Sequence, residues 1–268
     1  MEKRKFFLES IPPHRAVSVT PREVKGLFRS GIAAIRYTCP ETAGAQSSEF
    51  VCDDTDYGFG SLAADARRRT RRGLESCEVR KIDFDLLARE GCAINRSVFE
   101  RHGRHLQTFY TDEARWRKYM AVCETLPSVE AYGAFVDGAL CAFSLVVLID
   151  DYAYLFHTHA HSDYLRHSPM NALFYSITKN MLERPDVRVV SQGLESFAAR
   201  PELEHFKLAM GFHQRPIGRR TIVHPLARPI FSRPGAWVVD KFLKQFKPNL
   251  AEDFSVFAQA FQGLASER

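Results

Sequence analysis

Three histidines alternate along one short segment, at His157, His159 and His161. The segment from Tyr152 to His161 is rich in aromatic side chains, which favour a half-buried strand. Residues two apart on a strand point to the same face, so the three imidazoles should share one face of a sheet. Neighbours on that face lie roughly 6–7 Å apart, too far for all three to bind one ion, and no metal is predicted. Two interpretations remain: histidines hydrogen-bonded within the sheet, or His159 as a general base with His157 and His161 as substrate-binding groups.

Two charged residues follow the next stretch of strand-favouring residues, Val187 to Val190. Ligands of α/β sheets bind outside the carboxyl ends of the strands, which makes Glu195 a second candidate base. Lys207 lies in a Phe-Lys-Leu-Ala-Met-Gly-Phe run, where it could neutralise a phosphate or carboxylate of a substrate. The alternatives are an ordinary loop acid and a lysine exposed on a helix.

A predicted helix joins these two strands. Ser168-Pro169 should begin it, with a hydroxyl at the N-cap and proline at the first helical position. Apolar residues recur at spacings of three and four from Met170 to Met181, and Arg184-Pro185 ends the pattern. Pro201 to Met210 predicts another helix, with Gly211 just past its end. The order strand, helix, strand, helix predicts parallel strands joined by a right-handed crossover.

The rest of the chain adds strands and helices to this unit. Asp137-Gly138 predicts a tight hairpin turn. A helix from Ser61, stopped by Gly73, carries five arginines between Arg67 and Arg72. They cover its circumference, so it is either a solvated basic helix or one that contacts phosphate or RNA. The other predicted elements are strands at 31–37, 48–52, 77–82, 129–136, 140–149, 213–217 and 220–224 and helices at 83–101 and 112–125.

Composition indicates a globular protein. The chain has 268 residues, 45% of them hydrophobic, and a formal charge of +5, which permits anionic partners without requiring them. No segment has the roughly 20 apolar residues needed to span a bilayer, and the N-terminus does not resemble a signal peptide. The six cysteines are scattered, which favours buried thiols and a cytoplasmic location.

The order of elements from Cys77 to Pro225 is β-α-α-β-β-β-α-β-α-β-β, which resembles the GNAT acyltransferase fold element for element. Three shorter features resemble the single-GNAT relatives of the FemAB peptidyltransferases. They are the turn from Tyr164 to Pro169, the run from Phe206 to Phe212 and the arginine-rich segment before the first strand. The resemblance covers a little over half of the chain.

This resemblance implies an acyl-CoA donor, such as acetyl-CoA, bound between the strands at 152–161 and 187–192. GNAT enzymes usually hold its pyrophosphate on a glycine-containing loop at a helix N-terminus. Both family glycines are absent here. The implied contacts fall instead to Arg166, the Ser168 hydroxyl and the N–H groups of Met170 and Asn171. Tyr164, like Tyr154, becomes a candidate proton donor to the leaving group or a packed aromatic residue.

We therefore expect an α/β protein with a mixed sheet and a GNAT fold, divided into an N-terminal extension (1–75), a GNAT-like domain (76–226) and a C-terminal helical appendage (227–268). The expected activity is acyl transfer from acyl-CoA to an amine or hydroxyl of a small or precursor acceptor. One alternative is FemAB-like transfer from aminoacyl-tRNA to an envelope precursor, with Arg67 to Arg72 on the RNA. Another is a non-catalytic binding protein. The two amphipathic segments after residue 235 would pack on the main domain or on a second subunit, forming a homodimer.

Overall fold

The chain divides into two units. A computed structural model describes residues 2–4, 7–102, 108–195 and 201–231, together with residues 234, 235, 237, 239 and 241. The larger unit comprises Phe50–Gly193 and Glu202–His213, and the smaller one Met1–Glu49, Leu194–Pro201 and Gln214–Arg268. The predicted helices at 236–246 and 250–264 lie outside the described residues, apart from single positions.

A mixed sheet forms the centre of the larger unit, with strands in the order β9, β8, β7, β6, β5. Neighbours from β5 to β8 are antiparallel, whereas β8 and β9 are parallel. The β6–β7 turn has positive φ angles of 49° at Asp137 and 80° at Gly138, which confirms the predicted hairpin. The strands are β5 (Glu78–Ile82), β6 (Val129–Val136), β7 (Ala139–Ile149), β8 (Tyr152–Ala160) and β9 (Val189–Leu194).

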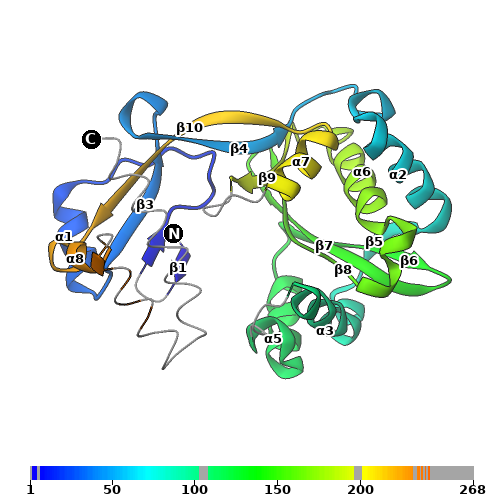
Figure 1. Cartoon of the computed structure of the whole chain (residues 1–268), viewed down its shortest axis with the longest axis horizontal. Coiled ribbons are helices and arrows are strands. Elements are labelled where there is room, and N and C mark those ends of the chain that lie inside the picture. The colour runs from blue at the N-terminus through cyan, green and yellow to red at the C-terminus, as the bar shows by residue number, and fades with distance from the viewer. Residues whose placement is uncertain are drawn as a thin grey trace. The chain divides into compact units, whose positions relative to one another are not determined.

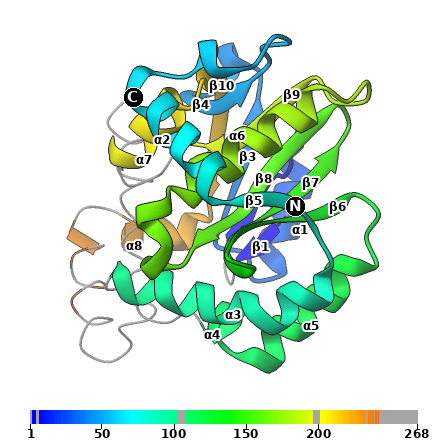
Figure 2. The same cartoon turned by 90° about the vertical axis from the view of Figure 1, so that its right-hand side faces the viewer.

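Helices cover both faces of this sheet. Helices α2 (Ala64–Ser76) and α6 (Pro169–Leu182) pack together on one face, and α3 (Phe84–Arg101) and α5 (Glu113–Glu124) on the other. Figure 2 shows α2 beside α6, and α3, α4 (Thr108–Thr111) and α5 grouped together. The connections include 3-10 helices η2 (Phe59–Ser61) and η3 (Ser162–His167), and α7 (Pro201–Ala209) follows β9.

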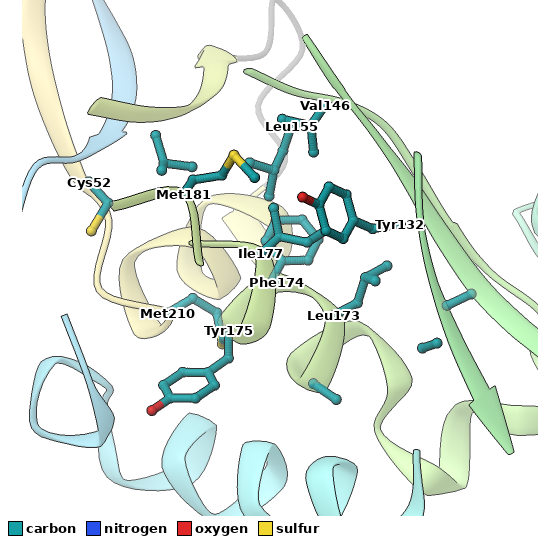
Figure 3. Packing of buried hydrophobic residues seen from close by; sticks show 14 of the residues in the cluster. Cys52, Tyr132, Val146, Leu155, Leu173, Phe174, Tyr175, Ile177, Met181 and Met210 are labelled. Carbon is teal, nitrogen blue, oxygen red and sulfur yellow. The ribbon is translucent and has the colours of Figure 1, made fainter. Parts of the chain in front are cut away.

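The main hydrophobic core lies between α6 and the sheet. Leu173, Phe174 and Ile177 of α6 point toward Tyr132, Val146 and Leu155 of the strands, as Figure 3 shows. The apolar face of α6 therefore packs against the sheet, as predicted. Fully burying side chains of this kind contributes about 1.5–3 kcal/mol each, so this layer holds α6 against the sheet.

In the smaller unit β2 pairs with β3 in parallel and β3 with β10 antiparallel. Helix α1 covers one face of these strands through an apolar cluster. On the other face Arg219, 1% exposed, donates hydrogen bonds to Glu9 and to Thr38 Oγ1. The elements that lie wholly or mostly in this unit are β1 (Glu2–Arg4), β2 (Phe7–Glu9), α1 (Pro21–Arg29), β3 (Ala34–Cys39), η1 (Glu41–Ala43), β4 (Ala45–Cys52), β10 (His213–Val223), η4 (Pro225–Ala227) and α8 (Arg228–Phe231).

Most predicted elements are confirmed, and three predictions are wrong. Gly73 does not stop α2, which continues to Ser76, and its N-cap is Ala63 rather than Ser61. The strands predicted at 213–217 and 220–224 are one strand, β10, which pairs with β3 through Gly218. A Cβ at Gly218 would lie 2.3 Å from the Pro40 carbonyl oxygen, so this glycine permits close strand approach rather than a turn. All six cysteines are buried and free, as expected.

Candidate active site

Strands β8 and β9 separate soon after they begin. Their last parallel pair is Tyr154 with Ser191, although both strands continue. Along β7, neighbouring residues face Leu155 and His157, which leaves Phe156 as the extra residue of a β-bulge. The Phe156 side chain is 57% exposed. Beyond this pair the backbone groups of β8 and β9 no longer pair with one another. This arrangement is expected of a site that binds an extended ligand between two strands.

The bulge also decides which face receives the histidines. Leu155 packs in the core beside α6, whereas His157 contacts the rings of Tyr110 and Phe143 at 4.6 and 5.5 Å between centroids, on the side of α3 and α5. Regular alternation would place residues 155 and 157 on the same face. The extra residue at Phe156 shifts the alternation by one, so His157 and His159 share the face covered by α3.

Asn95 of α3 joins these two histidines. Its Oδ1 lies 3.1 Å from His157 Nε2 and 2.7 Å from His159 Nδ1. Its Nδ2 donates to the Tyr110 carbonyl at 2.9 Å, which fixes the orientation of the amide. Because Oδ1 only accepts, both ring nitrogens that face it carry protons. Neutral His159 therefore has its lone pair on Nε2, the nitrogen that can take a proton.

Burial keeps the inner histidine neutral. Desolvation, together with the nearby His159, lowers the pKa of His157 well below its ordinary value. His159 is half-buried and meets the Phe99 ring edge-on, with centroids 6.1 Å apart. His157 can thus hold Asn95 in place, whereas His159 is the member of the pair that can reach solvent or a ligand.

Lys207 of α7 is the least expected group of the site, because it is buried. It is 5% exposed, and its Nζ donates to the Gln192 carbonyl at 3.2 Å and lies 4.3 Å from the centre of the Phe50 ring. Burial lowers the pKa of Lys207 to about 8, against the opposing effect of the Glu204 carboxylate. Gln192 is the first residue of β9 beyond its pairing with β8.

A second donor lies at the same point of β9. The Gln192 side-chain nitrogen Nε2 is buried and has no hydrogen-bond partner within the described part of the chain. Leaving such a donor unsatisfied costs about 1–3 kcal/mol, which a ligand oxygen would recover. The ammonium group that bonds to the Gln192 backbone and the Gln192 side-chain amide both belong to the point where β9 leaves β8. Donors of these two kinds can stabilise a negative oxygen.

The first turn of α6 is covered by α2. Ser168 has a positive φ of 55°, and its hydroxyl accepts bonds from Arg72 Nη2 at 2.7 Å and Nε at 3.2 Å instead of capping the helix. A Cβ at Gly73 would lie only 2.7 Å from the Ser168 carbonyl oxygen, so glycine is needed for this approach. The Asn171 N–H donates to the same carbonyl at 3.1 Å. These groups are engaged within the protein.

The arginines of α2 divide into distinct environments. Arg68 and Arg69 pair with Asp65 at 2.5 and 2.8 Å, and the Arg71 guanidinium lies 5.3 Å from the centre of the Phe59 ring. Arg67 Nη2 donates to the Leu62 carbonyl at 3.0 Å, while Arg72 reaches Ser168. Arg67 and Arg72 thus bond to the protein itself. Four of the five arginines are exposed, namely Arg68, Arg69, Arg71 and Arg72.

The other predicted residues are spread more widely. Glu195 belongs to the smaller unit, where its Oε2 accepts from Ser48 Oγ at 3.0 Å. His161 lies one residue beyond β8, and its Nδ1 is 3.7 Å from the Asp163 carboxylate.

The aromatic and cationic candidates near α6 take surface or packed positions. Arg166 is exposed and donates from Nε to His167 Nε2 at 3.0 Å. The Tyr164 ring packs 5.9 Å from His161, and Tyr154 stacks on Tyr152 at 5.7 Å.

Two features of this site carry no obvious signature in the sequence. Asn95 lies within an apolar helix pattern. Only its complete burial, which the structure shows, indicates that its amide has a polar partner in the sheet. The unpartnered amide of Gln192 depends on where β9 leaves β8. Among the described residues no group of three or more histidine, cysteine or acidic side chains could hold a metal ion, and no helix is long and apolar enough to cross a membrane.

The sequence profile described as an acetyltransferase (GNAT) domain matches residues 61–207. The chain belongs to the GNAT acetyltransferase family. It is therefore an acyltransferase of that family, with the splayed strands and bulge lying inside the matched region. No curated protein matches the sequence.

Solved structures share the GNAT fold at low sequence identity. FemX is 10% identical with a TM-score of 0.60, covering 78% of this chain and 77% of FemX. The C-terminal domain of a putative lysylphosphatidylglycerol synthetase from Agrobacterium fabrum is 13% identical with a TM-score of 0.55, covering 82% of this chain and 75% of the other. At these identities the likeness shows the fold alone.

Proposed function

We propose that the protein transfers an acyl group from a thioester donor, acyl-CoA, to the amine of a small or precursor acceptor. The observation that carries this proposal is the pair of donors, Lys207 and the Gln192 amide, at the point where β8 and β9 separate. An acyl arm between the strands would present its carbonyl oxygen to them. The oxygen becomes negative when the amine attacks, and that charge is what a buried ammonium group stabilises best.

The reaction proceeds by direct attack. The amine nitrogen forms a bond to the carbonyl carbon, the C–S bond breaks, and the electron pair of that bond leaves with the sulfur. His159 Nε2 takes the proton that the attacking nitrogen loses, and Asn95 holds the ring in the required tautomer. Lys207 or Tyr164 returns a proton to the thiolate. Glu195 is the alternative base. His161 flanks the acceptor side, and the buried His157 supports Asn95.

Because both family glycines are absent, other groups must bind the phosphates of the donor. Arg72 and Arg166 are both exposed and belong to segments that meet at the first turn of α6. We assign the pyrophosphate to these two guanidinium groups, with the N–H of Met170 and the partial positive charge of the helix N-terminus adding to them. Ser168 and Asn171 then support the turn, because their polar groups already bond within the protein.

A thermal-shift panel of acetyl-CoA, longer acyl-CoAs and free CoA tests the donor. A ligand that binds only the native state raises stability by RT ln(1 + [L]/Kd), so a bound CoA species raises Tm. The shift should weaken in Arg166→Ala and persist in Arg68→Ala, an exposed arginine paired with Asp65. No shift with any CoA species would reject this donor. Thiol release with an amine panel then tests transfer, and His159→Gln against Glu195→Gln identifies the base.

Aminoacyl-tRNA is a second candidate donor, favoured by the exposed arginines of α2. Phosphate contacts with RNA release counterions, so log K should fall with log salt at a slope of roughly −0.7 to −0.9 per contact. Replacing Arg71 and Arg72 together by glutamine should flatten that slope by about one to two. A slope unchanged by the double replacement would exclude α2 from RNA contact.

A further inference from the structure

The smaller unit contains a pocket of about 720 Å³ that the acyl-transfer proposal does not use. It lies between α1 and the neighbouring strands β3 and β10, which run side by side in Figure 1. Its walls include the apolar side chains of Val24, Phe28 and Ile222, and its lining also includes Lys25, Arg29 and Arg220. Pockets of roughly 300–1,000 Å³ suit small organic ligands.

The charge of this pocket has one sign. The three basic side chains are exposed, and none of the described residues that line the pocket is acidic. In the part of the chain that the structure describes, no carboxylate forms an ion pair with any of them. The one acidic residue of α1, Glu23, is engaged in the capping box, with its Oε2 2.8 Å from the Thr20 backbone nitrogen. An anion bound in the pocket would therefore relieve the mutual repulsion of these cations.

His224 adds a donor to the same wall. Its Nδ1 accepts the Leu226 N–H at 3.2 Å, so the neutral ring carries its proton on Nε2. The ring is held edge-on against Phe28, with centroids 4.9 Å apart. An apolar wall and cationic groups in one pocket match a ligand that has both an aliphatic part and an anionic head.

We propose that this pocket binds a lipid phosphate, an amphiphile whose alkyl chain lies against Val24, Phe28 and Ile222 and whose phosphate is held by Lys25, Arg29 and Arg220. Three guanidinium and ammonium groups suit a phosphate, which offers several acceptor oxygens and up to two charges. The inference does not rest on the proposed function, since all residues that line the pocket belong to the smaller unit.

Titration calorimetry with dodecyl phosphate, below its micelle concentration, tests the proposal on the full chain. We expect saturable binding at one site, and at least tenfold weaker binding in the double variant Arg29→Gln/Arg220→Gln. Both side chains are exposed, so the variant should melt as the wild type does. Arg22→Gln is the matched control: Arg22 is exposed on the same helix but does not line the pocket, and its affinity should be unchanged.

Two further ligands separate the parts of the probe. Inorganic phosphate supplies the head without the chain, and dodecyl maltoside supplies the chain without the charge; each should bind at least tenfold more weakly than dodecyl phosphate. Equal binding of either one would overturn the proposed amphiphile. Failure of dodecyl phosphate to bind, or equal loss of affinity in Arg22→Gln and in the double variant, would overturn the proposed site.

Discussion

Replacing Lys207 by methionine should make the protein more stable and inactive at the same time. The folded chain buries an ammonium group at neutral pH, because the pKa of Lys207 falls from its ordinary value of 10.5 only to about 8. Each unit of pKa corresponds to 1.36 kcal/mol, so holding the charged form at pH 7 costs about 3 kcal/mol. Methionine fills a similar volume without charge. It leaves the Gln192 carbonyl without this donor, which costs about 1–2 kcal/mol.

The net expectation is a gain of about 1–2 kcal/mol, or roughly 2–8 °C in Tm for a domain of this size. Its pH dependence has a defined sign. Between pH 8 and 10.5 the unfolded chain binds a proton that the folded chain has lost, so wild-type stability rises with pH there. The advantage of Lys207→Met should therefore be full below pH 8 and should disappear toward pH 10.5.

Urea unfolding of both proteins at several pH values between 6 and 10.5 measures this difference directly. Thiol release from the donor measures the accompanying loss of transfer, expected to be 10²-fold or more from the loss of one charged stabilising group. Gln192→Leu is the matched variant, because it removes the second donor without touching the buried charge. A methionine variant that is less stable at pH 7, or equally active, would refute the role given to Lys207.

Three further changes test the rest of the site. His157→Phe should reduce the loss of stability in acid, measured by urea unfolding. Below pH 6.5 the unfolded chain protonates a histidine that the folded chain keeps neutral, which costs the wild type up to about 1.4 kcal/mol of stability per pH unit. Asn95→Leu should destabilise by about 1–3 kcal/mol, because two ring N–H groups lose their acceptor, and should lower kcat more than it raises KM; unchanged kcat would remove His159 as the base. Gly73→Ala should cost about 1–3 kcal/mol and weaken donor binding, since its Cβ would meet the Ser168 carbonyl; a neutral effect on melting would contradict the packing of α2 on α6.

The sequence predicts the β-α-β region well because local signals there agree with the packing. The alternation of β6 and β7, the Asp137-Gly138 turn and the apolar spacing of α6 each specify one structure. Helix α1 has a capping box at Thr20 and Glu23 and a proline at its start, so the sequence does contain a local signal for this helix. The misplaced ends at Gly73 and Gly218 share one cause. A glycine needed for close approach has the same appearance in a sequence as a glycine that breaks an element.

The candidate site could be predicted only in part. Residue type and position in the sequence identify His159 and Lys207. The arrangement of the histidines, however, depends on a bulge at Phe156 that no local sequence pattern predicts. Lys207 was expected on a surface or beside a substrate, and its burial against Phe50 and Gln192 depends on contacts from distant segments. Asn95 was missed because an isolated buried amide acquires meaning only when its partners on β8 are known.

The most direct test of the account is a crystal structure of the protein with a bound acyl donor or a stable analogue. The account predicts the acyl chain between β8 and β9, with the carbonyl oxygen within about 3 Å of Lys207 Nζ or the Gln192 amide nitrogen. An acyl group bound elsewhere, with Lys207 still bonded only to the Gln192 carbonyl, would contradict it.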